Sequence, residues 1–309
     1  MILGLGAGMG YIYWKMKMGD QDYVFIGGRA NNKNFFENIG KRVGVKIQRF
    51  STSSEKKAQK TLLDQLTLKH PAMLFGDMGF LPWFDLPEDY HFGGHTFVVC
   101  GYDQKNKVLA SDIDQKSPGM KKGFYYPITL EELRKARNSP FKPFPPKNTY
   151  LRFDFNEFHN PTSEDIFSSI RQTVDAQLYP PIKNFGVKGL RHTSKEILKW
   201  PTIFDEEVLR LNLFTLYIFI EIGGTGSGCF RYMYSRFLKE ASKITGNVDL
   251  VKASKMIYDA GKKFSEIGIL FKEPDKIDQV SEKIKIASEK FSELADLEER
   301  SFSFLKANI

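Results

Sequence analysis

The sequence contains Tyr90-His-Phe-Gly-Gly-His95-Thr-Phe-Val-Val-Cys-Gly-Tyr-Asp103, which is followed closely by Val108-Leu-Ala-Ser-Asp112. A histidine leads into a short apolar run, a Gly-Tyr-Asp turn follows, and a second apolar run ends in an aspartate. This order predicts two adjacent antiparallel strands that carry His95 and Asp112. Asp114 has the same strand parity as Asp112 and is the alternative partner.

The residue types of this stretch suit proton transfer to and from a thiol. A neutral imidazole can take a proton from a cysteine, and a buried carboxylate fixes the tautomer of that imidazole. The pattern therefore indicates His95 as a general base and Asp112 as its orienter, with a cysteine as the nucleophile. The early cysteine that should open a helix is missing from the sequence. The alternative is a strand histidine and a turn aspartate without a catalytic role.

The composition indicates a globular protein with room for a sizeable core. The chain has 309 residues, 41% of them hydrophobic, and its 45 basic and 37 acidic residues give a net charge of +8. The basic residues are mostly dispersed lysines, which argues against nucleic-acid binding and is compatible with an acidic substrate or carrier protein. Two cysteines, Cys100 and Cys229, make no disulfide framework and favour a reducing compartment.

Nothing in the sequence predicts a membrane partner. The N-terminus lacks the basic region of a signal peptide. The most apolar segment, residues 211–222, is too short to span a bilayer and predicts a buried core helix. We therefore expect a cytoplasmic protein.

The first half of the chain mixes helical and strand periods. Helices are expected at 34–43, from 53 to about 69, and at 129–137. Short runs rich in β-branched and aromatic residues predict strands at 45–50, 72–75, 96–100, 108–111, 124–126 and 149–155. Short consecutive strands after early helices indicate an antiparallel sheet with helices on one side, and hence an α+β fold.

The second half has helical periodicity. Thr162-Ser-Glu-Asp165 resembles a capping box, and apolar residues follow it at helical spacing. Further amphipathic helices are expected after the glycine-rich turn at 223–228 and from Pro274 onward. We therefore predict a mixed α+β domain at 1–157 and an all-helical domain at 158–309.

Three further motifs have features of binding sites. His91 and His95 have the spacing of a metal pair on a helix, but Gly93 and Gly94 interrupt a helix there and no third ligand is evident, so we predict no metal. The glycines between Gly4 and Gly10 do not fit the dinucleotide-binding spacing, and no cofactor is expected. The second turn, with Gly224, Gly226, Gly228 and Arg231, is a candidate anion-binding turn at a helix N-terminus, or a helix-to-helix turn without a ligand.

Neither cysteine is a convincing nucleophile. Cys100 lies five residues after His95 on the same predicted strand, so the two side chains should point to opposite faces, and we expect Cys100 in the core. Cys229 opens a predicted helix, where the helix dipole would lower the pKa of its thiol.

Long stretches of the chain resemble known families. The opening Met1-Ile-Leu-Gly-Leu-Gly-Ala-Gly-Met-Gly-Tyr-Ile-Tyr-Trp14, together with the strands 94–103 and 108–112, resembles the butirosin-biosynthesis protein H (BtrH) N-terminal family. Gly186-Val-Lys-Gly189 and Ile222-Gly-Gly-Thr-Gly-Ser-Gly-Cys-Phe-Arg231, with the helix that follows to 241, resemble the uncharacterised helical domain that commonly comes after it.

The resemblance implies a papain-like sheet domain, related to cysteine peptidases, that lacks its first helix here. It also implies an acyltransferase of antibiotic biosynthesis that moves an acyl group from an acyl carrier protein, or another acyl-thioester donor, to a small amine. In that scheme His95 is the general base and Asp112 its orienter. Family members carry a His-Cys stretch upstream of the Gly-Leu-Gly motif at which this chain begins, so we expect that the gene start lies further upstream. The alternatives are a papain-like peptidase or amidase, and a non-catalytic binding protein on a decayed enzyme domain.

Overall fold

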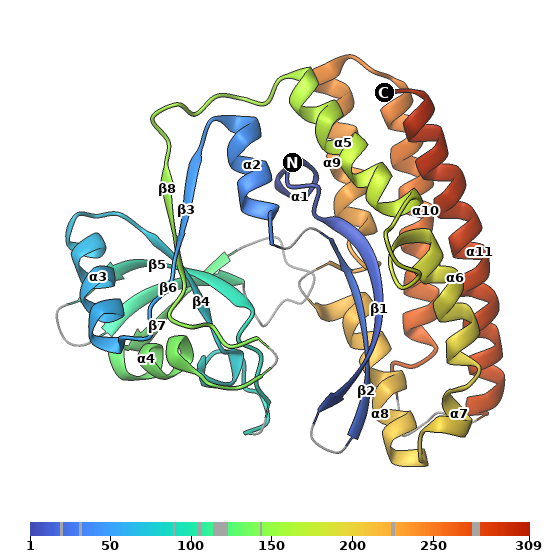
Figure 1. Ribbon diagram of the computed structural model, residues 1–309, viewed down its shortest axis with the longest axis horizontal. Helices are drawn as coiled ribbons and strands as arrows, with labels where there is room; N and C mark the ends of the chain where they lie inside the picture. The colour runs from blue at the N-terminus through green and yellow to red at the C-terminus, as the bar shows by residue number, and fades with distance from the viewer. Residues whose placement is uncertain are drawn as a thin grey trace. The chain divides into compact units, whose positions relative to one another are not determined.

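The computed structural model divides the chain into two compact units. It describes residues 1–18, 21–30, 33–88, 90–103, 107–113, 123–142, 144–223, 226–273 and 279–309. One unit, here called the sheet unit, spans Val45–Asn156. The other, here called the hairpin–helix unit, combines Met1–Gly44 with Glu157–Ile309. Both are shown in Figure 1, and each is described by itself.

The sheet unit contains an antiparallel sheet with the strand order β3-β8-β4-β5-β6-β7 among its described residues. The strands are β3 (Lys46–Phe50), β4 (Ala72–Gly76), β5 (His95–Tyr102), β6 (Lys107–Ile113), β7 (Gly123–Thr129) and β8 (Tyr150–Asp154). Two helices, α3 (Glu55–Thr67) and α4 (Leu130–Asn138), and the short 3-10 helix η1 (Met78–Phe80) complete the unit.

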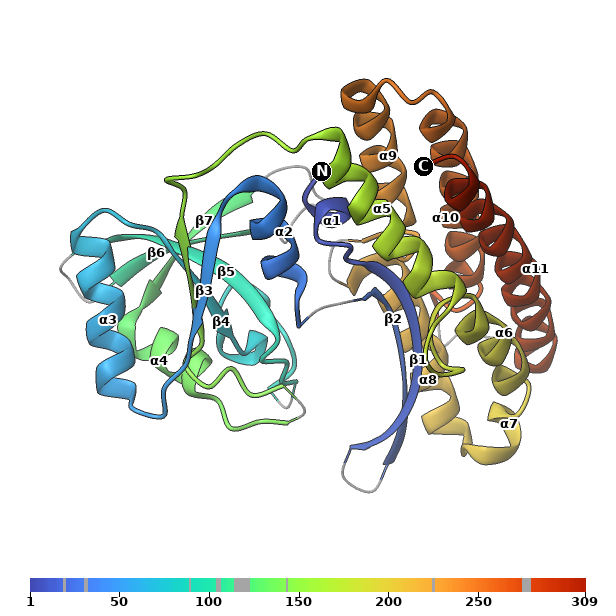
Figure 2. The same ribbon diagram turned by 45° about the horizontal axis from the view of Figure 1, so that its top comes forward.

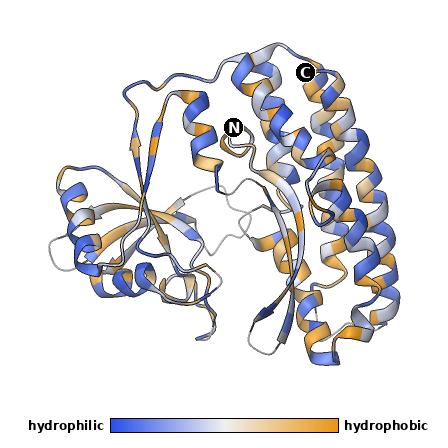
Figure 3. Cartoon of the chain, viewed as in Figure 1, coloured by the Kyte–Doolittle hydropathy of each residue, from blue (hydrophilic) through white to orange (hydrophobic). Residues whose placement is uncertain are grey.

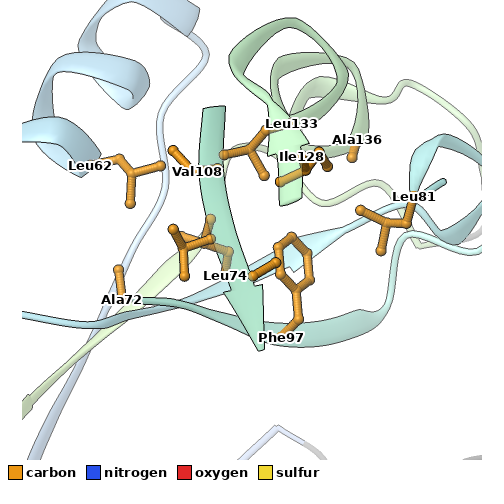
Figure 4. Close-up of a cluster of buried hydrophobic side chains, with 11 residues drawn as sticks. Leu62, Ala72, Leu74, Leu81, Phe97, Val108, Ile128, Leu133 and Ala136 are labelled. Carbon is orange, nitrogen blue, oxygen red and sulfur yellow. The ribbon is translucent and has the colours of Figure 1, made fainter. Parts of the chain in front are cut away.

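The core of the sheet unit lies between one face of the sheet and these helices. Leu62 of α3 and Leu133 of α4 belong to the same buried cluster as Leu74, Phe97 and other strand residues. Figure 4 shows Leu62 and Leu133 above Leu74, Ala72 and Phe97 of the strands. The strand members of the cluster alternate with more exposed residues, as the period of a half-buried strand requires. The face on which Phe97 lies is therefore the covered face of the sheet.

The hairpin–helix unit begins with α1 (Ile2–Leu5), the paired strands β1 (Met9–Met18) and β2 (Gln21–Arg29), and α2 (Phe35–Val43). Its second part contains α5 (Ser163–Leu178), α6 (Gly186–Ile197), α7 (Trp200–Ile203), α8 (Glu206–Tyr217), the π-helix η2 (Ile218–Ile222), α9 (Arg231–Thr245), α10 (Asp249–Ile269) and α11 (Val280–Ala307). Figure 2 shows the hairpin beside the helices of this unit. Hydrophobic and hydrophilic stretches alternate along these helices in Figure 3, as expected for helices that bury one face.

The β1–β2 hairpin is joined to the helices by buried hydrogen bonds. The Tyr11 hydroxyl lies 2.7 Å from the Thr193 hydroxyl of α6, and Trp200 Nε1 donates to the Tyr13 hydroxyl at 3.3 Å. On the other strand, the amide side chain of Asn212 accepts from Val24 N at 2.9 Å and donates to the Asp22 carbonyl at 3.2 Å. Asn212 thus pairs with the backbone of β2 as a neighbouring strand would.

The α+β fold with an antiparallel sheet and a helical C-terminal region is confirmed, but the compact units differ from the linear division at residue 157. The change of unit at Asn156 and Glu157 coincides with the predicted boundary, whereas Met1–Gly44 groups with the helices. The physical reason is burial: Tyr11 and Tyr13 are each 1% exposed because helices of their own unit cover them. A single boundary in the sequence cannot describe a unit that combines the first 44 residues with residues 157–309.

The individual elements follow the predictions with small shifts. Each strand and helix expected in residues 34–155 is present, with ends displaced by a few residues. The capping box at Thr162 is formed, because its hydroxyl accepts from Asp165 N and the Asp165 carboxylate accepts from Thr162 N. The apolar segment 211–222 is not one α-helix, since α8 passes into the π-helix η2 at Ile218. Pro274 lies outside the described residues. No helix in the described ranges combines the length and apolarity needed to cross a bilayer.

Candidate functional site

His95 and Asp112 lie on neighbouring antiparallel strands of the sheet unit. His95 is the first residue of β5 and pairs with Gly76 of β4, and Asp112 lies near the end of β6. Strands β5 and β6 pair with Val98 opposite Ser111. The alternation of side chains then places His95 and Asp112 on the covered face. Asp112 is opposite Phe97, and His95 lies two residues before Phe97 on β5. The parity of the two apolar runs is therefore what brings an imidazole and a carboxylate to one face.

The two side chains form a short hydrogen bond. His95 Nε2 lies 2.6 Å from Asp112 Oδ2, and the side chains are 16% and 4% exposed. The predicted pairing of His95 with Asp112 is confirmed as geometry, and the catalytic roles of the two residues remain a prediction. Asp114, the alternative partner, lies outside the described residues.

This geometry defines what the imidazole can do. A carboxylate accepts a hydrogen bond, so the Nε2 atom of a neutral His95 carries the proton and donates it to Asp112. The lone pair is then on Nδ1, which is the atom that can accept a proton from a thiol or an amine. The ring of Phe84 stands edge-on to the imidazole with centroids 5.0 Å apart. The site thus contains a histidine that is oriented on one side and basic on the other.

Trp83 is a third member of the site, and sequence reasoning missed it. Its indole Nε1 donates to Asp112 Oδ2 at 2.9 Å, so this one oxygen accepts both from Trp83 and from His95. Trp83 belongs to the segment between η1 and β5, which has no helical or strand period. The signal that could have found it is the run of aromatic residues in Leu81-Pro-Trp-Phe84, which is unusual for an exposed loop.

Asp77 forms a second buried network in the same segment. It is 0% exposed, and its Oδ1 atom accepts from the backbone N atoms of Gly79 at 3.1 Å and Phe92 at 2.9 Å. Its Oδ2 atom accepts from the Ser139 hydroxyl at 2.5 Å and lies 3.0 Å from His91 Nδ1. His91 is therefore a partner of Asp77 and does not form a pair with His95. Among the described residues, no three histidine, cysteine or acidic side chains gather as metal ligands.

The structure corrects the expectations about both cysteines. Cys100 is exposed and does not lie in the core, and its thiol donates to the Leu109 carbonyl at 3.5 Å. Cys229 is fully buried, and this burial raises the pKa of its thiol to about 12. The expected lowering by the helix dipole is therefore wrong, because removal from water outweighs the helix N-terminus and the nearby Arg231.

Arg231, at the start of α9, forms its hydrogen bonds with groups of the protein itself. Arg231 is 0% exposed and forms a bidentate ion pair with the buried Glu298, with Nε–Oε1 and Nη2–Oε2 distances of 2.6 and 3.0 Å. Its Nη1 atom donates to the carbonyls of Gly10 and Cys229 at 2.6 and 2.7 Å. The interpretation of Arg231 as part of an anion site is therefore contradicted, because its donors are occupied within the core.

The described glycines of the turn before α9 also serve the packing of the protein. The Glu221 carboxylate accepts from the Ser227 hydroxyl at 2.6 Å and lies 3.3 Å from Gly228 N, so an acidic side chain of the chain occupies the turn. A Cβ atom at Gly226 would overlap the Phe230 ring, and Gly228 has a φ of +62°. Gly224 lies outside the described residues. The requirement for glycine at 226 and 228 is explained by packing and backbone conformation.

Comparison with known protein families gives two matches. The family described as "Butirosin biosynthesis protein H, N-terminal" matches residues 1–113, which include both strands of the His95–Asp112 pair. The family described as "Domain of unknown function (DUF4872)" matches residues 131–305. A search of the curated proteins found no match. The chain therefore belongs to the family of this domain of unknown function, and ahead of that domain it carries the N-terminal region of the butirosin biosynthesis protein H family.

Proposed function

We propose that this protein is a cysteine-dependent acyltransferase of the BtrH type, which moves an acyl group from a carrier thioester to a small amine. The observation that supports this proposal is the 2.6 Å hydrogen bond between His95 Nε2 and Asp112 Oδ2. It leaves Nδ1 of His95 as the base of a thiol–imidazole–carboxylate arrangement. Residues 1–113 match the BtrH N-terminal family. The resemblance to this family implies acyl transfer, which favours it over other uses of such an arrangement.

The reaction consists of two acyl transfers. His95 Nδ1 takes the thiol proton, and the thiolate attacks the carbonyl carbon of the donor thioester. The bond from this carbon to the carrier sulfur breaks, and the carrier thiol leaves with the proton from His95. The acceptor amine then attacks the acyl-enzyme and gives a proton to His95. The enzyme thiolate leaves and takes this proton back from His95, which restores the thiol and the neutral imidazole. The products are one amide and one free carrier thiol, with no other reagent consumed.

The thiolate is not assigned to either cysteine of this sequence. Cys229 is buried with a thiol pKa of about 12, which leaves its thiol protonated at neutral pH. Cys100 lies on the exposed face of β5, opposite to the face that carries His95. In the family that the sequence resembles, a His-Cys stretch precedes the Gly-Leu-Gly motif. The proposal therefore requires a cysteine other than Cys100 and Cys229, of the kind that this His-Cys stretch supplies in the family.

The test compares two proteins in the same assay. One is the chain as printed, and the other is the chain extended by the in-frame codons upstream of Met1. Each is incubated with an acyl-carrier thioester, with and without primary amines, and the thioester and amide are measured by mass spectrometry. We expect amide formation only with the extended chain, and its loss on His95→Ala.

Three outcomes would overturn the proposal. Upstream codons that encode a stop before any cysteine would remove the nucleophile. Thioester loss without any amide would indicate a hydrolase. Unchanged biological output after His95→Ala would indicate a non-catalytic binding protein.

A further inference from the structure

The Oδ2 atom of Asp112 accepts hydrogen bonds from two different parts of the sheet unit. His95 Nε2 lies at 2.6 Å and Trp83 Nε1 at 2.9 Å from this oxygen. A carboxylate that accepts one hydrogen bond can still rotate about its terminal torsion, which is a broad and weakly restrained one. A second, fixed donor at the same oxygen removes that freedom. Trp83 therefore limits where Asp112 presents its charge.

The indole of Trp83 is itself held in place by aromatic rings. It stacks on Tyr126 of β7, with centroids 4.9 Å apart and an interplanar angle of 12°. It also meets Phe97 edge-on with centroids 5.8 Å apart. Such contacts fix the plane of the ring and hence the direction of its N–H group. The donor is rigid, although it lies in a segment without regular secondary structure.

The segment that carries Trp83 is closed at both ends by one buried carboxylate. Asp77 accepts from Gly79 N before Trp83 and from Phe92 N after it. Asp77 also follows directly after Gly76, which pairs with His95. The closure thus ties the Trp83 segment to the strand end at which the histidine is located.

We infer that Trp83 is a positioning residue, which holds Asp112 Oδ2 against His95 Nε2 and thereby keeps the lone pair of the imidazole on Nδ1. The consequence for acyl transfer rests on the function proposed above, whereas the consequence for the imidazole tautomer does not. A Trp83 that served packing alone would change stability on substitution and leave the tautomer unchanged. The tautomer is therefore the measurement that separates the two roles.

The experiment uses Trp83→Phe, which keeps an aromatic ring and removes the N–H donor. The full chain is labelled with ¹⁵N-histidine, and the tautomer of His95 is read from the shifts of its two ring nitrogens at alkaline pH, where imidazoles are neutral. The signals of His95 are assigned by their absence in His95→Gln. We expect the Nε2–H tautomer in the unsubstituted chain and a mixture of both tautomers in Trp83→Phe. In the extended chain we expect amide formation to fall about tenfold, as for the loss of one hydrogen bond to a charged group.

A matched control is available in the other unit. Trp200 is 0% exposed, and its indole donates to the Tyr13 hydroxyl at 3.3 Å. Trp200→Phe removes one buried indole N–H in the same way, and we expect it to lower the melting temperature without any change in the His95 tautomer. If Trp83→Phe does not fold, β-(3-benzothienyl)alanine at position 83 replaces only the N–H group by sulfur and keeps the bicyclic ring.

The results of this experiment separate the inference from the proposed function. An unchanged tautomer in a folded protein without the Trp83 donor overturns the inference, whatever the activity. A mixed tautomer together with no amide formation by the extended chain supports the positioning role and contradicts the acyltransferase. A mixed tautomer with a reduced rate of amide formation supports both.

Discussion

His95 and Asp112 meet diagonally across two strands of the sheet unit, with Nε2 and Oδ2 2.6 Å apart. The pairing of Val98 with Ser111, continued by one residue, places Asp112 opposite Phe97. His95 lies two residues before Phe97 on β5, and side chains in such a diagonal relationship on one face are close enough to contact each other. Because strand parity fixes this relationship, the hydrogen bond is a property of the sheet register.

Asp112→Ala is expected to reduce acyl transfer by the extended chain by roughly 10²–10⁴-fold, because it removes the acceptor that keeps the proton of His95 on Nε2. Without an acceptor beside Nε2 the imidazole is no longer held in the Nε2–H tautomer, so the proton also occupies Nδ1, the atom that must accept one. Initial rates of amide formation measure the effect. Asp154→Ala, which removes an exposed carboxyl of β8, is the control and should leave the rate unchanged. Equal rates in the two variants would contradict the role of Asp112.

The buried pair of Arg231 and Glu298 should stabilise the hairpin–helix unit far more than a surface pair. Both side chains are 0% exposed, so Glu298→Leu leaves a guanidinium buried without its counter-ion and should cost about 3–5 kcal/mol in the free energy of unfolding. Urea unfolding measures this cost. The double variant Arg231→Met with Glu298→Leu should be more stable than the sum of the two single changes predicts, because the uncompensated charge is gone.

An exposed ion pair is the control for this prediction. Lys263 and Glu293 form a 2.6 Å pair with exposed fractions of 30% and 59%. Glu293→Gln should change the free energy of unfolding by no more than about 1 kcal/mol. A Glu298→Leu cost as small as this would show that the buried pair does not hold the core together.

Gly44 lies where the chain leaves the hairpin–helix unit, and Gly44→Ala should destabilise the protein by about 2–4 kcal/mol. It ends α2 with a φ of +64°, and a Cβ atom there would overlap the Glu157 carbonyl, where the chain re-enters the unit. Gly246 is the matched control, since it ends α9 with a φ of +72° and a Cβ atom at this position would meet no other atom within 4 Å. Gly246→Ala should cost only about 1 kcal/mol. Equal shifts in thermal unfolding would show that the contact with Glu157 is unimportant.

Alkaline pH should destabilise the hairpin–helix unit through Cys229. Burial raises the pKa of its thiol from the ordinary 9.0 to about 12 in the folded state. The folded state therefore binds the thiol proton more tightly, and this stabilising contribution is complete below pH 9 and is lost as the pH rises towards 12. Burial also raises the pKa of Tyr13 to about 12, which adds to the loss above pH 10.

Urea unfolding at a series of pH values tests this effect. In Cys229→Ala the decline in stability should begin later, near pH 10, where Tyr13 takes over, whereas Cys100→Ala should change the curve less because that thiol is exposed. Thiol titration should find one reactive cysteine in the folded protein and two in denaturant. Rapid labelling of both thiols under native conditions would contradict the burial of Cys229.

The local elements could be predicted from the amino-acid sequence alone. Short runs rich in β-branched and aromatic residues predicted the strands of the sheet unit, and Thr162 with Asp165 predicted the start of α5. These signals act between residues that are a few positions apart, so an amino-acid sequence displays them directly. The resemblance to a papain-like sheet implied that His95 and Asp112 are partners, and the register of β5 and β6 places them on one face.

Which distant groups are partners depends on the complete fold. It placed the β1–β2 hairpin with the C-terminal helices, brought Trp83 to Asp112, and paired Arg231 with Glu298, which lies 67 residues further along the chain. The sequence around Arg231 is compatible with an anion site and with an internal ion pair, and the choice depends on which acidic side chain the packing of α11 brings into the core. Burial and the need to satisfy buried polar groups made that choice, and both depend on the complete fold.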